Sequence, residues 1–292
     1  MRLRSPLFAP GDSERKMTKA IASAADAVIL DLEDSVAAPA KPTARAMVPQ
    51  VVRSHPGRDL IVRVNPRGTP WYLADLAAVV PARPTAVMLP KCSGPADLAT
   101  LDHHLEVLET AAGAPVGSIG VVAIVTETAG SVFTLGAYAG VASRLLAICF
   151  GAEDLSADLG ISPRHPDGSY PAPVILARAE VLIAAGALGV PAIDTPYPDH
   201  SDPIGLRREA EIAAADGFAG KILIHPAQID VVNTAFTPSP GQVRWAEKVR
   251  DAFAANPDAG VFALDGKMID RPHYKLAQRI LAAAGGEPER AR

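Results

Sequence analysis

The chain has 292 residues, 49% of them hydrophobic, and carries a net charge of −4 with a sequence pI near 6.0. This length and hydrophobic content fit one large α/β domain or two smaller ones. Lysine and arginine are scattered along the sequence, which excludes the concentrated positive charge of a nucleic-acid-binding surface. No apolar run approaches the ~18 residues of a membrane helix.

The N-terminal residues and the cysteines indicate the cellular compartment. The opening stretch MRLRSPLFAP reaches Pro6 before any apolar segment develops, unlike a signal peptide. Cys92 and Cys149 lie at or near apolar runs, which favours buried thiols over a disulfide or a zinc site. We therefore expect a soluble, cytoplasmic protein.

Short apolar runs rich in β-branched residues recur along the chain and predict eight strands. In chain order they are SPLFAP (5–10), AVILDLED (27–34), LIVRVN (60–65), AVMLPK (86–91), VVAIVTET (121–128), LLAICFGAED (145–154), PAIDTPYP (191–198) and KILIHPAQI (221–229). Such near-continuous hydrophobicity is typical of parallel strands that are covered on both faces. Most intervals between them contain alanine-rich stretches of helical length, for example 14–25 and 173–189.

Eight strands that alternate with helices predict a (β/α)₈ TIM barrel rather than an open sheet. A doubly wound sheet would be expected to carry a glycine-rich dinucleotide turn after an early strand. The candidate turn, APGDSER (9–15), has a single glycine. We assign residues 1–249 to the barrel and residues 250–292 to a C-terminal helical extension.

Polar residues end most of the predicted strands, and two of them indicate a metal site. The carboxyl ends of barrel strands meet on one face, where TIM-barrel enzymes carry out catalysis. Glu127 and Asp154 follow neighbouring strands and precede glycine-containing turns. Two close carboxylates in a low-dielectric site repel, and a hard cation such as Mg²⁺ removes that conflict. The alternative is an acid/base dyad that shares a proton; we favour the metal because Arg63 and Lys91 indicate an anionic substrate.

Arg63 lies inside the apolar run LIVRVN and predicts a bound anion. A buried guanidinium needs a negative partner, and its planar fork matches a carboxylate in two places. The structural alternative is a salt bridge to Glu33 or Asp34 on the adjacent strand. Lys91 would serve a substrate anion; a Schiff base is less favoured, because the carboxylate pair indicates metal chemistry.

The turn Gly151–Ala152 after the sixth strand lets the backbone approach a ligand, and we assign it to substrate binding. Its N–H groups are candidates for supporting a developing oxyanion. Strand alternation predicts that Glu153 points away from Asp154, so we assign it no catalytic role.

Three further polar residues have structural interpretations. His225, in the stretch LIHPAQ, is either a base or a buried structural histidine. Asp31 and Asp194, at the ends of the second and seventh strands, are predicted to pair with cations within the barrel.

Several segments together resemble a known family. They are FAPGDSERK, VILDLEDSV, IVRVNPRGT, VMLPK, IVTETAG, FGAEDLSADLG, KILIHPAQI and DGKMIDRPH, and they follow one another along nearly the whole chain. The sequence resembles the citrate lyase β-subunit-like branch of the HpcH/HpaI aldolase superfamily, which includes citramalyl-CoA and malyl-CoA lyases. The segments around the metal site and the C-terminal DGKMID are the most specific.

The resemblance implies a TIM barrel that binds Mg²⁺, with Mn²⁺ as a second candidate, through Glu127 and Asp154. It implies that Arg63 binds the carboxylate of a 2-oxo acid and that Glu127 also lies at the substrate. CoA-dependent members form trimers or hexamers in which the C-terminal segment supplies an acid to a neighbouring subunit. Here that acid matches Asp270, with Asp265 as the competitor. The alternative is that Asp270 is an ordinary N-cap of a helix packed on its own barrel.

The implied reaction is carbon–carbon cleavage of a thioester such as malyl-CoA or citramalyl-CoA to a 2-oxo acid and acetyl-CoA. Asp270 would donate a proton to the acetyl-CoA enolate, or remove that proton in the condensation direction. A carboxyl needs a raised pKa for this transfer, and burial at a subunit interface raises it. Lys41 and Arg45, one helical turn apart, would meet the CoA phosphates or else be solvated surface charges.

Three other functions remain open. One is the β subunit of a citrate lyase, acting on a citryl thioester of an acyl carrier protein. Another is a CoA-independent, metal-dependent pyruvate aldolase, against which the DGKMID segment argues. The third is a barrel that has lost catalysis, which should show substitutions at Glu127, Asp154 or Arg63; all three residues are present.

Overall fold

The computed structural model describes residues 1–138, 140, 143–256 and 260–285. Its contacts divide the chain into two compact units, Met1–Asn233 and Thr234–Arg292. The division falls before the sequence-based boundary at residue 249. The reason is that α10 (Pro240–Ala255) packs against α11 (Arg271–Ala283) and shares the core of the second unit.

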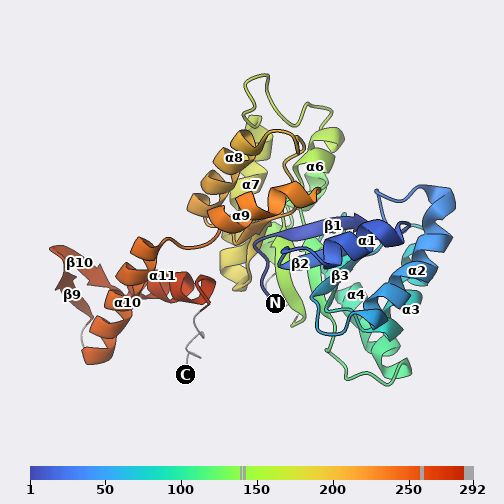
Figure 1. Cartoon of the computed structure of the whole chain (residues 1–292), viewed down its shortest axis with the longest axis horizontal. Helices are drawn as coiled ribbons and strands as arrows, with labels where there is room; N and C mark the ends of the chain where they lie inside the picture. Colours follow the sequence, from blue (N-terminus) through green and yellow to red (C-terminus); the bar gives the residue numbers. More distant parts are fainter. Residues whose placement is uncertain (139, 141–142, 257–259, 286–292) are drawn as a thin grey trace. The chain divides into compact units, whose positions relative to one another are not determined.

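The first unit contains one sheet of eight parallel strands that follow one another in sequence order (Figure 1). They are β1 (Pro6–Pro10), β2 (Ala27–Asp31), β3 (Leu60–Arg63), β4 (Ala86–Leu89), β5 (Gly120–Ile124), β6 (Leu145–Cys149), β7 (Ala192–Asp194) and β8 (Gly220–Lys221). All eight strands predicted from the apolar runs are present. The predicted (β/α)₈ TIM-barrel fold is confirmed.

Helices connect the strands and surround the sheet (Figure 1). The α-helices are α1 (Glu14–Ile21), α2 (Lys41–Ser54), α3 (Tyr72–Val79), α4 (Pro95–Ala111), α5 (Ala129–Val132), α6 (Ala152–Asp158), α7 (Ala172–Leu188), α8 (Pro203–Asp216) and α9 (Ile229–Ala235). Short 3₁₀ turns are η1 (Ala38–Ala40), η2 (Val80–Ala82), η3 (Leu135–Ala137) and η4 (Pro226–Gln228). The predicted helices at 14–25 and 173–189 correspond to α1 and α7.

The barrel closes where β8 meets the first strand. A parallel bridge joins Leu7 to Leu223, and the Phe8 N–H donates to the Leu223 carbonyl at 2.9 Å. Gly220 allows this approach, because a Cβ there would lie 1.8 Å from the backbone oxygen of Leu3. Any side chain at this position would push β8 away from the N-terminal segment.

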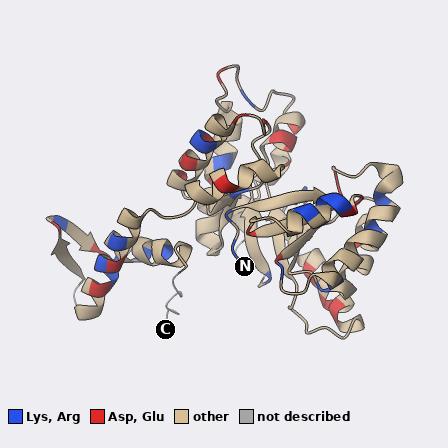
Figure 2. Ribbon diagram, viewed as in Figure 1, with Lys and Arg blue, Asp and Glu red and all other residues tan. Residues whose placement is uncertain are grey.

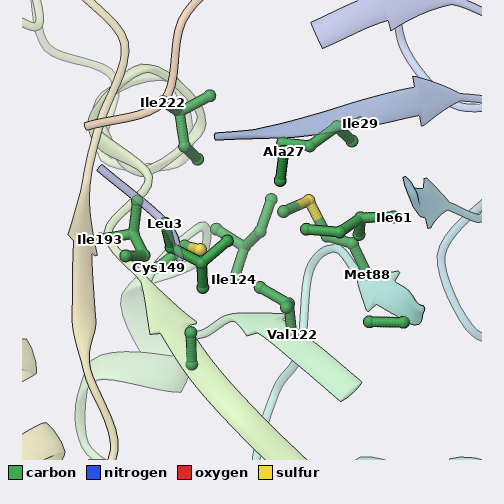
Figure 3. Packing of buried hydrophobic residues seen from close by; sticks show 12 residues of the cluster. Leu3, Ala27, Ile29, Ile61, Met88, Val122, Ile124, Cys149, Ile193 and Ile222 are labelled. Atoms are coloured by element: carbon green, nitrogen blue, oxygen red, sulfur yellow. The ribbon is translucent and has the colours of Figure 1, made fainter. Parts of the chain in front are cut away.

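The barrel interior is filled by apolar side chains that alternate along the strands (Figure 3). Inward residues are two apart, as Ala27 and Ile29 are, while the residues between them face the helices. Burial of each larger aliphatic side chain contributes about 1.5–3 kcal/mol. The interior cluster is made of Leu3, Ala27, Ile29, Ile61, Ala86, Met88, Val122, Ile124, Ala147, Cys149, Ile193 and Ile222.

The second unit is a helix, a β-hairpin and a second helix. Strands β9 (Val261–Leu264) and β10 (Lys267–Asp270) pair antiparallel between α10 and α11. Asp265 and Gly266 form the turn with φ of +51° and +75°, as a two-residue type I′ turn requires. Only helices were predicted here; the Asp-Gly pair between two short apolar stretches was the signal for the hairpin.

Figure 2 shows Lys and Arg on the same helices as Asp and Glu, for example on α1 and α10. Among the helices of the described residues, none combines the length and the apolar character that crossing a membrane demands.

Candidate active site

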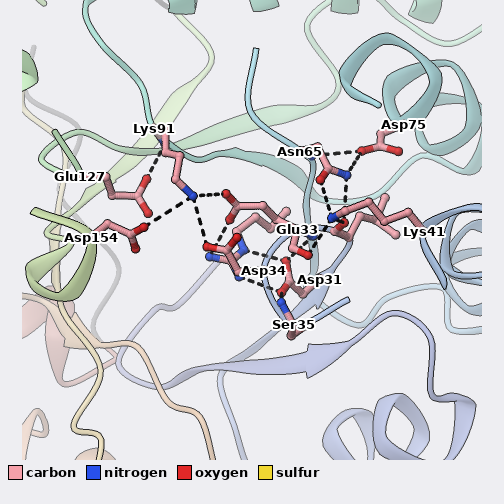
Figure 4. Close-up of polar contacts among 12 residues, drawn as sticks. Asp31, Glu33, Asp34, Ser35, Lys41, Asn65, Asp75, Lys91, Glu127 and Asp154 are labelled. Carbon is pink, nitrogen blue, oxygen red and sulfur yellow. Dashed lines mark hydrogen bonds and ion pairs between the residues drawn. The ribbon is translucent and has the colours of Figure 1, made fainter. Parts of the chain in front are cut away.

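Five of the predicted polar residues lie at the carboxyl ends of neighbouring strands. Asp31 ends β2 and Arg63 ends β3, while Lys91 follows β4 by two residues. Glu127 lies between β5 and α5, and Asp154 lies in the first turn of α6 after β6. Figure 4 shows Glu127, Asp154 and Lys91 side by side. The predicted convergence of the two carboxylates is present.

Arg63 is held by two carboxylates. Its Nε and Nη2 donate to the two oxygens of Asp31 at 2.6 and 2.7 Å, and its Nη1 lies 3.0 Å from Glu33 Oε2. The guanidinium also stacks over the ring of Phe8 at 4.4 Å. Burial lowers the pKa of Arg63, but the hydrogen bonds and charge of Asp31 outweigh it and raise the pKa overall. The predicted internal pairing of Asp31 is confirmed.

Lys91 connects four carboxylates. Its Nζ lies 2.6 Å from Glu33, 3.2 Å from Asp34 and 3.5 Å from Asp154, and its backbone N–H donates to Glu127. Its φ of +49° is a left-handed conformation that costs a non-glycine residue about 1–3 kcal/mol. Burial lowers the pKa of Lys91, but the bond to Glu33 and the other carboxylates raise it overall. A Schiff-base lysine needs a lowered pKa, so this environment disfavours that role.

Glu127 is the most strongly perturbed acid of the site. Its side chain is buried, with 4% of the residue exposed. The pKa of Glu127 is raised to about 8; burial is the largest cause, the charges of Glu33 and Asp154 act in the same direction, and the hydrogen bond from the Lys91 N–H opposes them. A Cβ at Gly151 would lie 2.7 Å from Glu127 Cγ, so only glycine leaves room for this carboxylate. A bound cation would relieve the repulsion that these carboxylates exert on one another.

The site has an excess of negative charge that suits a divalent cation. Five carboxylates surround two cations, which leaves three negative charges uncompensated if all are ionised. No three His, Cys, Asp or Glu side chains within the described ranges converge as a metal site of their own. Mg²⁺ takes one or two carboxylates and completes its shell with water and substrate oxygens, so Glu127 and Asp154 fit it.

The turn after β6 starts a helix. The Gly151 N–H donates to Thr126 Oγ1 at 3.0 Å, and the Ala152 N–H donates to Thr195 Oγ1 at 3.2 Å. An oxyanion at these two amides would therefore compete with threonine hydroxyls. Neither threonine was predicted as a site residue, although Thr126 precedes Glu127 directly and Thr195 follows β7.

The direction of the Glu153 side chain was predicted from the alternation of side chains along a strand. This premise was wrong, because residues Ala152–Asp158 form α6. Glu153 and Asp154 both lie in the first turn of that helix, where carboxylates interact favourably with its dipole. Glu153 is exposed, and Lys91 contacts Asp154 instead.

The two residues predicted to meet CoA phosphates have internal partners. Lys41 is buried, and its Nζ donates to Asn65 Oδ1 at 2.6 Å and to two backbone carbonyls of the loop after β2 at 2.8 and 2.9 Å. Because all three N–H donors of the Lys41 ammonium group already have acceptors, none is left for the expected contact with CoA. Arg45 Nε donates to Asp75 at 2.7 Å, and its side chain is 20% exposed.

His225 is exposed, so it is not the buried structural histidine that was one interpretation. It caps η4, and its Nδ1 accepts the N–H of Ala227 at 3.2 Å. Its ring lies 4.7 Å from that of His200. Asp194 pairs with the buried Lys221 at 2.9 Å, as predicted.

Asp270 ends β10 and occupies the N-cap position of α11. Its Oδ1 lies 2.5 Å from Nδ1 of His273, and about a third of its side chain (34%) is exposed. Asp265 lies in the hairpin turn and pairs with Lys248 at 2.8 Å. The N-cap position is as the alternative predicted; the role of either acid in a neighbouring subunit stays a prediction.

Residues 4–226 match the HpcH/HpaI aldolase/citrate lyase family. The chain belongs to this family, and its relatives make it a carbon–carbon lyase. The family resemblance drawn from the sequence motifs is confirmed.

Three known proteins are similar along almost the whole chain. Citrate lyase subunit beta of Escherichia coli (strain K12) is 36% identical over 285 residues, covering 96% of this chain and 93% of that protein. The mitochondrial citramalyl-CoA lyase of Rattus norvegicus is 33% identical over 303 residues, covering 96% and 86%. The structure of CitE from Mycobacterium tuberculosis in complex with magnesium, acetoacetate and coenzyme A matches with a TM-score of 0.77 and 38% identity, covering 97% and 98%.

Proposed function

We propose that the chain is a Mg²⁺-dependent lyase that cleaves, or in reverse forms, a 3-hydroxyacyl-CoA bearing a carboxylate on its hydroxyl carbon. Citramalyl-CoA and malyl-CoA are such thioesters, and the products are a 2-oxo acid and acetyl-CoA. The observation that carries the proposal is the pair Glu127 and Asp154 beside Arg63 and Lys91. The similarity to a citramalyl-CoA lyase and to CitE with magnesium, acetoacetate and coenzyme A supports it.

Glu127 and Asp154 would hold the Mg²⁺ ion, with Mn²⁺ as a possible substitute. When bound, the metal supplies Lewis-acid stabilisation for negative charge on a substrate oxygen. Gly151 keeps the space that Glu127 occupies. Lys91 fixes Glu127 through its backbone and Asp154 through its side chain, which presets both carboxylates.

Arg63 would bind the carboxylate of the 2-oxo acid portion. Asp31 holds the guanidinium through Nε and Nη2, which leaves Nη1 as the nitrogen that a substrate carboxylate would share with Glu33. Such fork-like pairing fixes orientation as well as adding binding energy. The hydroxyl gives up its proton to water, its carbon becomes the carbonyl carbon of the 2-oxo acid as the carbon–carbon bond breaks, and the electrons of that bond pass to the thioester enolate.

The enolate carbon needs a proton to become acetyl-CoA. We assign this transfer to Asp270 of a neighbouring subunit in a trimer or hexamer, with Asp265 as the other candidate. The support is the family resemblance of the DGKMID segment together with the exposed part of the Asp270 carboxylate.

A cleavage assay tests the proposal. The purified chain is given citramalyl-CoA, malyl-CoA and citryl-CoA after removal of metal with EDTA, and 2-oxo acid release is followed on addition of Mg²⁺ or Mn²⁺. We expect one of the three thioesters to release a 2-oxo acid, and to do so only when metal is present. Release that is insensitive to EDTA, or condensation of free pyruvate with simple aldehydes instead, would contradict it. Simultaneous assay of free CoA detects any thioesterase step.

A second function is favoured by the 36% identity to citrate lyase subunit beta. In that case the substrate is a citryl thioester of an acyl carrier protein, and the product is oxaloacetate. The same assay with citryl-loaded carrier protein separates the two functions, because the barrel chemistry is shared and only the thioester carrier differs.

A further inference from the structure

A polar cavity of about 260 Å³ lies at the end of the barrel opposite to the candidate active site. It is formed where the chain enters β3, β4 and β5, by the turn before Leu60, the residues Arg83–Thr85 and Ser118. The proposed lyase function uses none of these residues. Its charged lining consists of Arg58, Arg83 and Asp59, with His55 beside them.

Arg58 lines the cavity with an incompletely satisfied guanidinium. Its Nη1 donates to the carbonyl of Asp26 at 3.1 Å, and its Nη2 donates to the carbonyl of Ala25. Its Nε is buried and has no hydrogen-bond partner. A guanidinium has five N–H donors, and burial without an anion is unfavourable for this charge.

Arg83 adds a second guanidinium in a conformation that arginine rarely adopts. Its φ is +57°, in the left-handed region. Its Nη2 donates to the carbonyls of Gly113 at 3.0 Å and Ala112 at 3.4 Å, at the C-terminus of α4. The donors on Nε and Nη1 are left for another acceptor.

The charges around the cavity do not balance. Within the described part of the chain, neither Arg58 nor Arg83 forms an ion pair with a carboxylate. The two guanidinium groups and the carboxylate of Asp59 together carry a net charge of +1. The His55 ring donates through Nδ1 to the Val51 carbonyl at 2.9 Å, so Nε2 takes no part in this hydrogen bond.

We propose that this cavity binds a small oxyanion of the phosphate class, with Arg58 and Arg83 as its counter-charges. Both side chains pair readily with tetrahedral oxyanions because of their planar forks. The volume is below the about 300–1,000 Å³ of pockets for drug-sized ligands, which suits a small anion with a few waters. The bound anion would join the entry turns of three strands and stabilise the barrel.

Titration of the full chain with inorganic phosphate, without metal and at low ionic strength, tests the proposal. We expect saturable binding of one phosphate per chain by calorimetry, and NMR shifts at the amides of Gly57 and Asp59. Arg83→Gln and Arg58→Gln should each weaken binding by about tenfold, the equivalent of one charge-assisted hydrogen bond. Asp59→Asn should tighten it, because it removes the one opposing charge.

The controls separate this cavity from other sites. Arg53→Gln, an exposed change on α2 outside the cavity, should leave the affinity unchanged. Lys91→Gln should also leave it unchanged, whereas phosphate bound in the candidate active site would be weakened. Absence of saturable binding, or loss in Lys91→Gln but not in Arg83→Gln, overturns the proposal. Because Arg83 is exposed, its variant decides the outcome even where Arg58→Gln fails to fold.

Discussion

Gly151 stands where any side chain would collide with the candidate metal ligand Glu127. A Cβ at this position would lie 2.7 Å from Glu127 Cγ and 3.2 Å from Ile124 Cγ2. We expect Gly151→Ala to displace the carboxylate and reduce Mg²⁺-dependent activity by about 10–100-fold, as loss of support around a metal ligand does. Activity at a series of Mg²⁺ concentrations measures this effect.

Gly136→Ala is the matched control, because nothing lies within 4 Å of a Cβ there and its φ is not positive. This variant should keep the activity and the Mg²⁺ dependence of the wild type. Equal activity of both alanine variants would mean that the position of Glu127 does not matter for turnover.

The two carboxylates themselves are tested by replacing their charge. Glu127→Gln and Asp154→Asn keep the shape of the side chain but remove the negative charge that Mg²⁺ needs. We expect both variants to lose Mg²⁺ binding in calorimetry and Mg²⁺-dependent turnover, with an unchanged circular dichroism spectrum. Glu153→Gln, next to Asp154 but exposed, should keep both. Full turnover in either charge-removing variant would exclude the metal site.

Residue positions could be predicted where they depend on the end of a strand. Glu127, Asp154 and Arg63 follow apolar runs, and parallel strands bring such residues together. The partners of Lys41, which lies on a helix, could not be predicted. Lys41 reaches Asn65, 24 residues away, and a sequence pattern does not show whether a lysine on an amphipathic helix points inward or outward.

At the scale of elements, the second unit shows where the sequence pattern was too weak. Strands β9 and β10 have four residues each and are partly exposed, so their apolar stretches are too short to stand out in the sequence. The pair Asp265 and Gly266 carried the turn signal, but Asp265 was considered only as a candidate acid and not as a turn residue. The boundary placed at residue 249 lies inside α10, which buries Ala246, Val249 and Phe253 in the core of the second unit.

The hairpin geometry distinguishes the two candidate acids. Asp270 leads directly into α11, whereas Asp265 is held at the turn by Lys248. We expect Asp270→Asn to lose turnover while it keeps Mg²⁺ binding, because asparagine preserves an N-cap but cannot transfer the proton. Asp265→Asn, which tolerates the left-handed turn, should retain turnover. The reverse result would assign the proton transfer to Asp265.

At the scale of the whole molecule, the fold could be predicted because one constraint repeats eight times. Each strand must be apolar on both faces, since one face packs into the barrel and the other against helices. The closure of the barrel could not be predicted from the sequence in the same way. It depends on Gly220 and on bonds between Leu223 and the first strand, and β8 itself has only two residues.

The stability of the barrel in acid should depend on the buried Glu109. Burial alone would raise the pKa of this carboxyl, but N–H groups of Gly117 and Ile119 and the charge of Arg144 lower it overall. A pKa lowered in the folded state contributes stability that is complete above the unfolded value of about 4.3. That contribution is lost as the pH falls through the folded value.

Urea unfolding at pH values between 7 and 3 measures this contribution. We expect Glu109→Gln to lose about 3 kcal/mol at pH 7, because it leaves Arg144 buried without one of its two carboxylates. The difference from the wild type should shrink as the pH falls below about 4.3, where the unfolded chain takes up a proton at Glu109, and should be lost below the lowered pKa of the folded state. Glu106→Gln, a change at a half-buried position on the same helix, should match the wild type throughout. A Glu109→Gln deficit that stays constant across this range would mean that packing, and not the ionised carboxylate, is what Glu109 supplies.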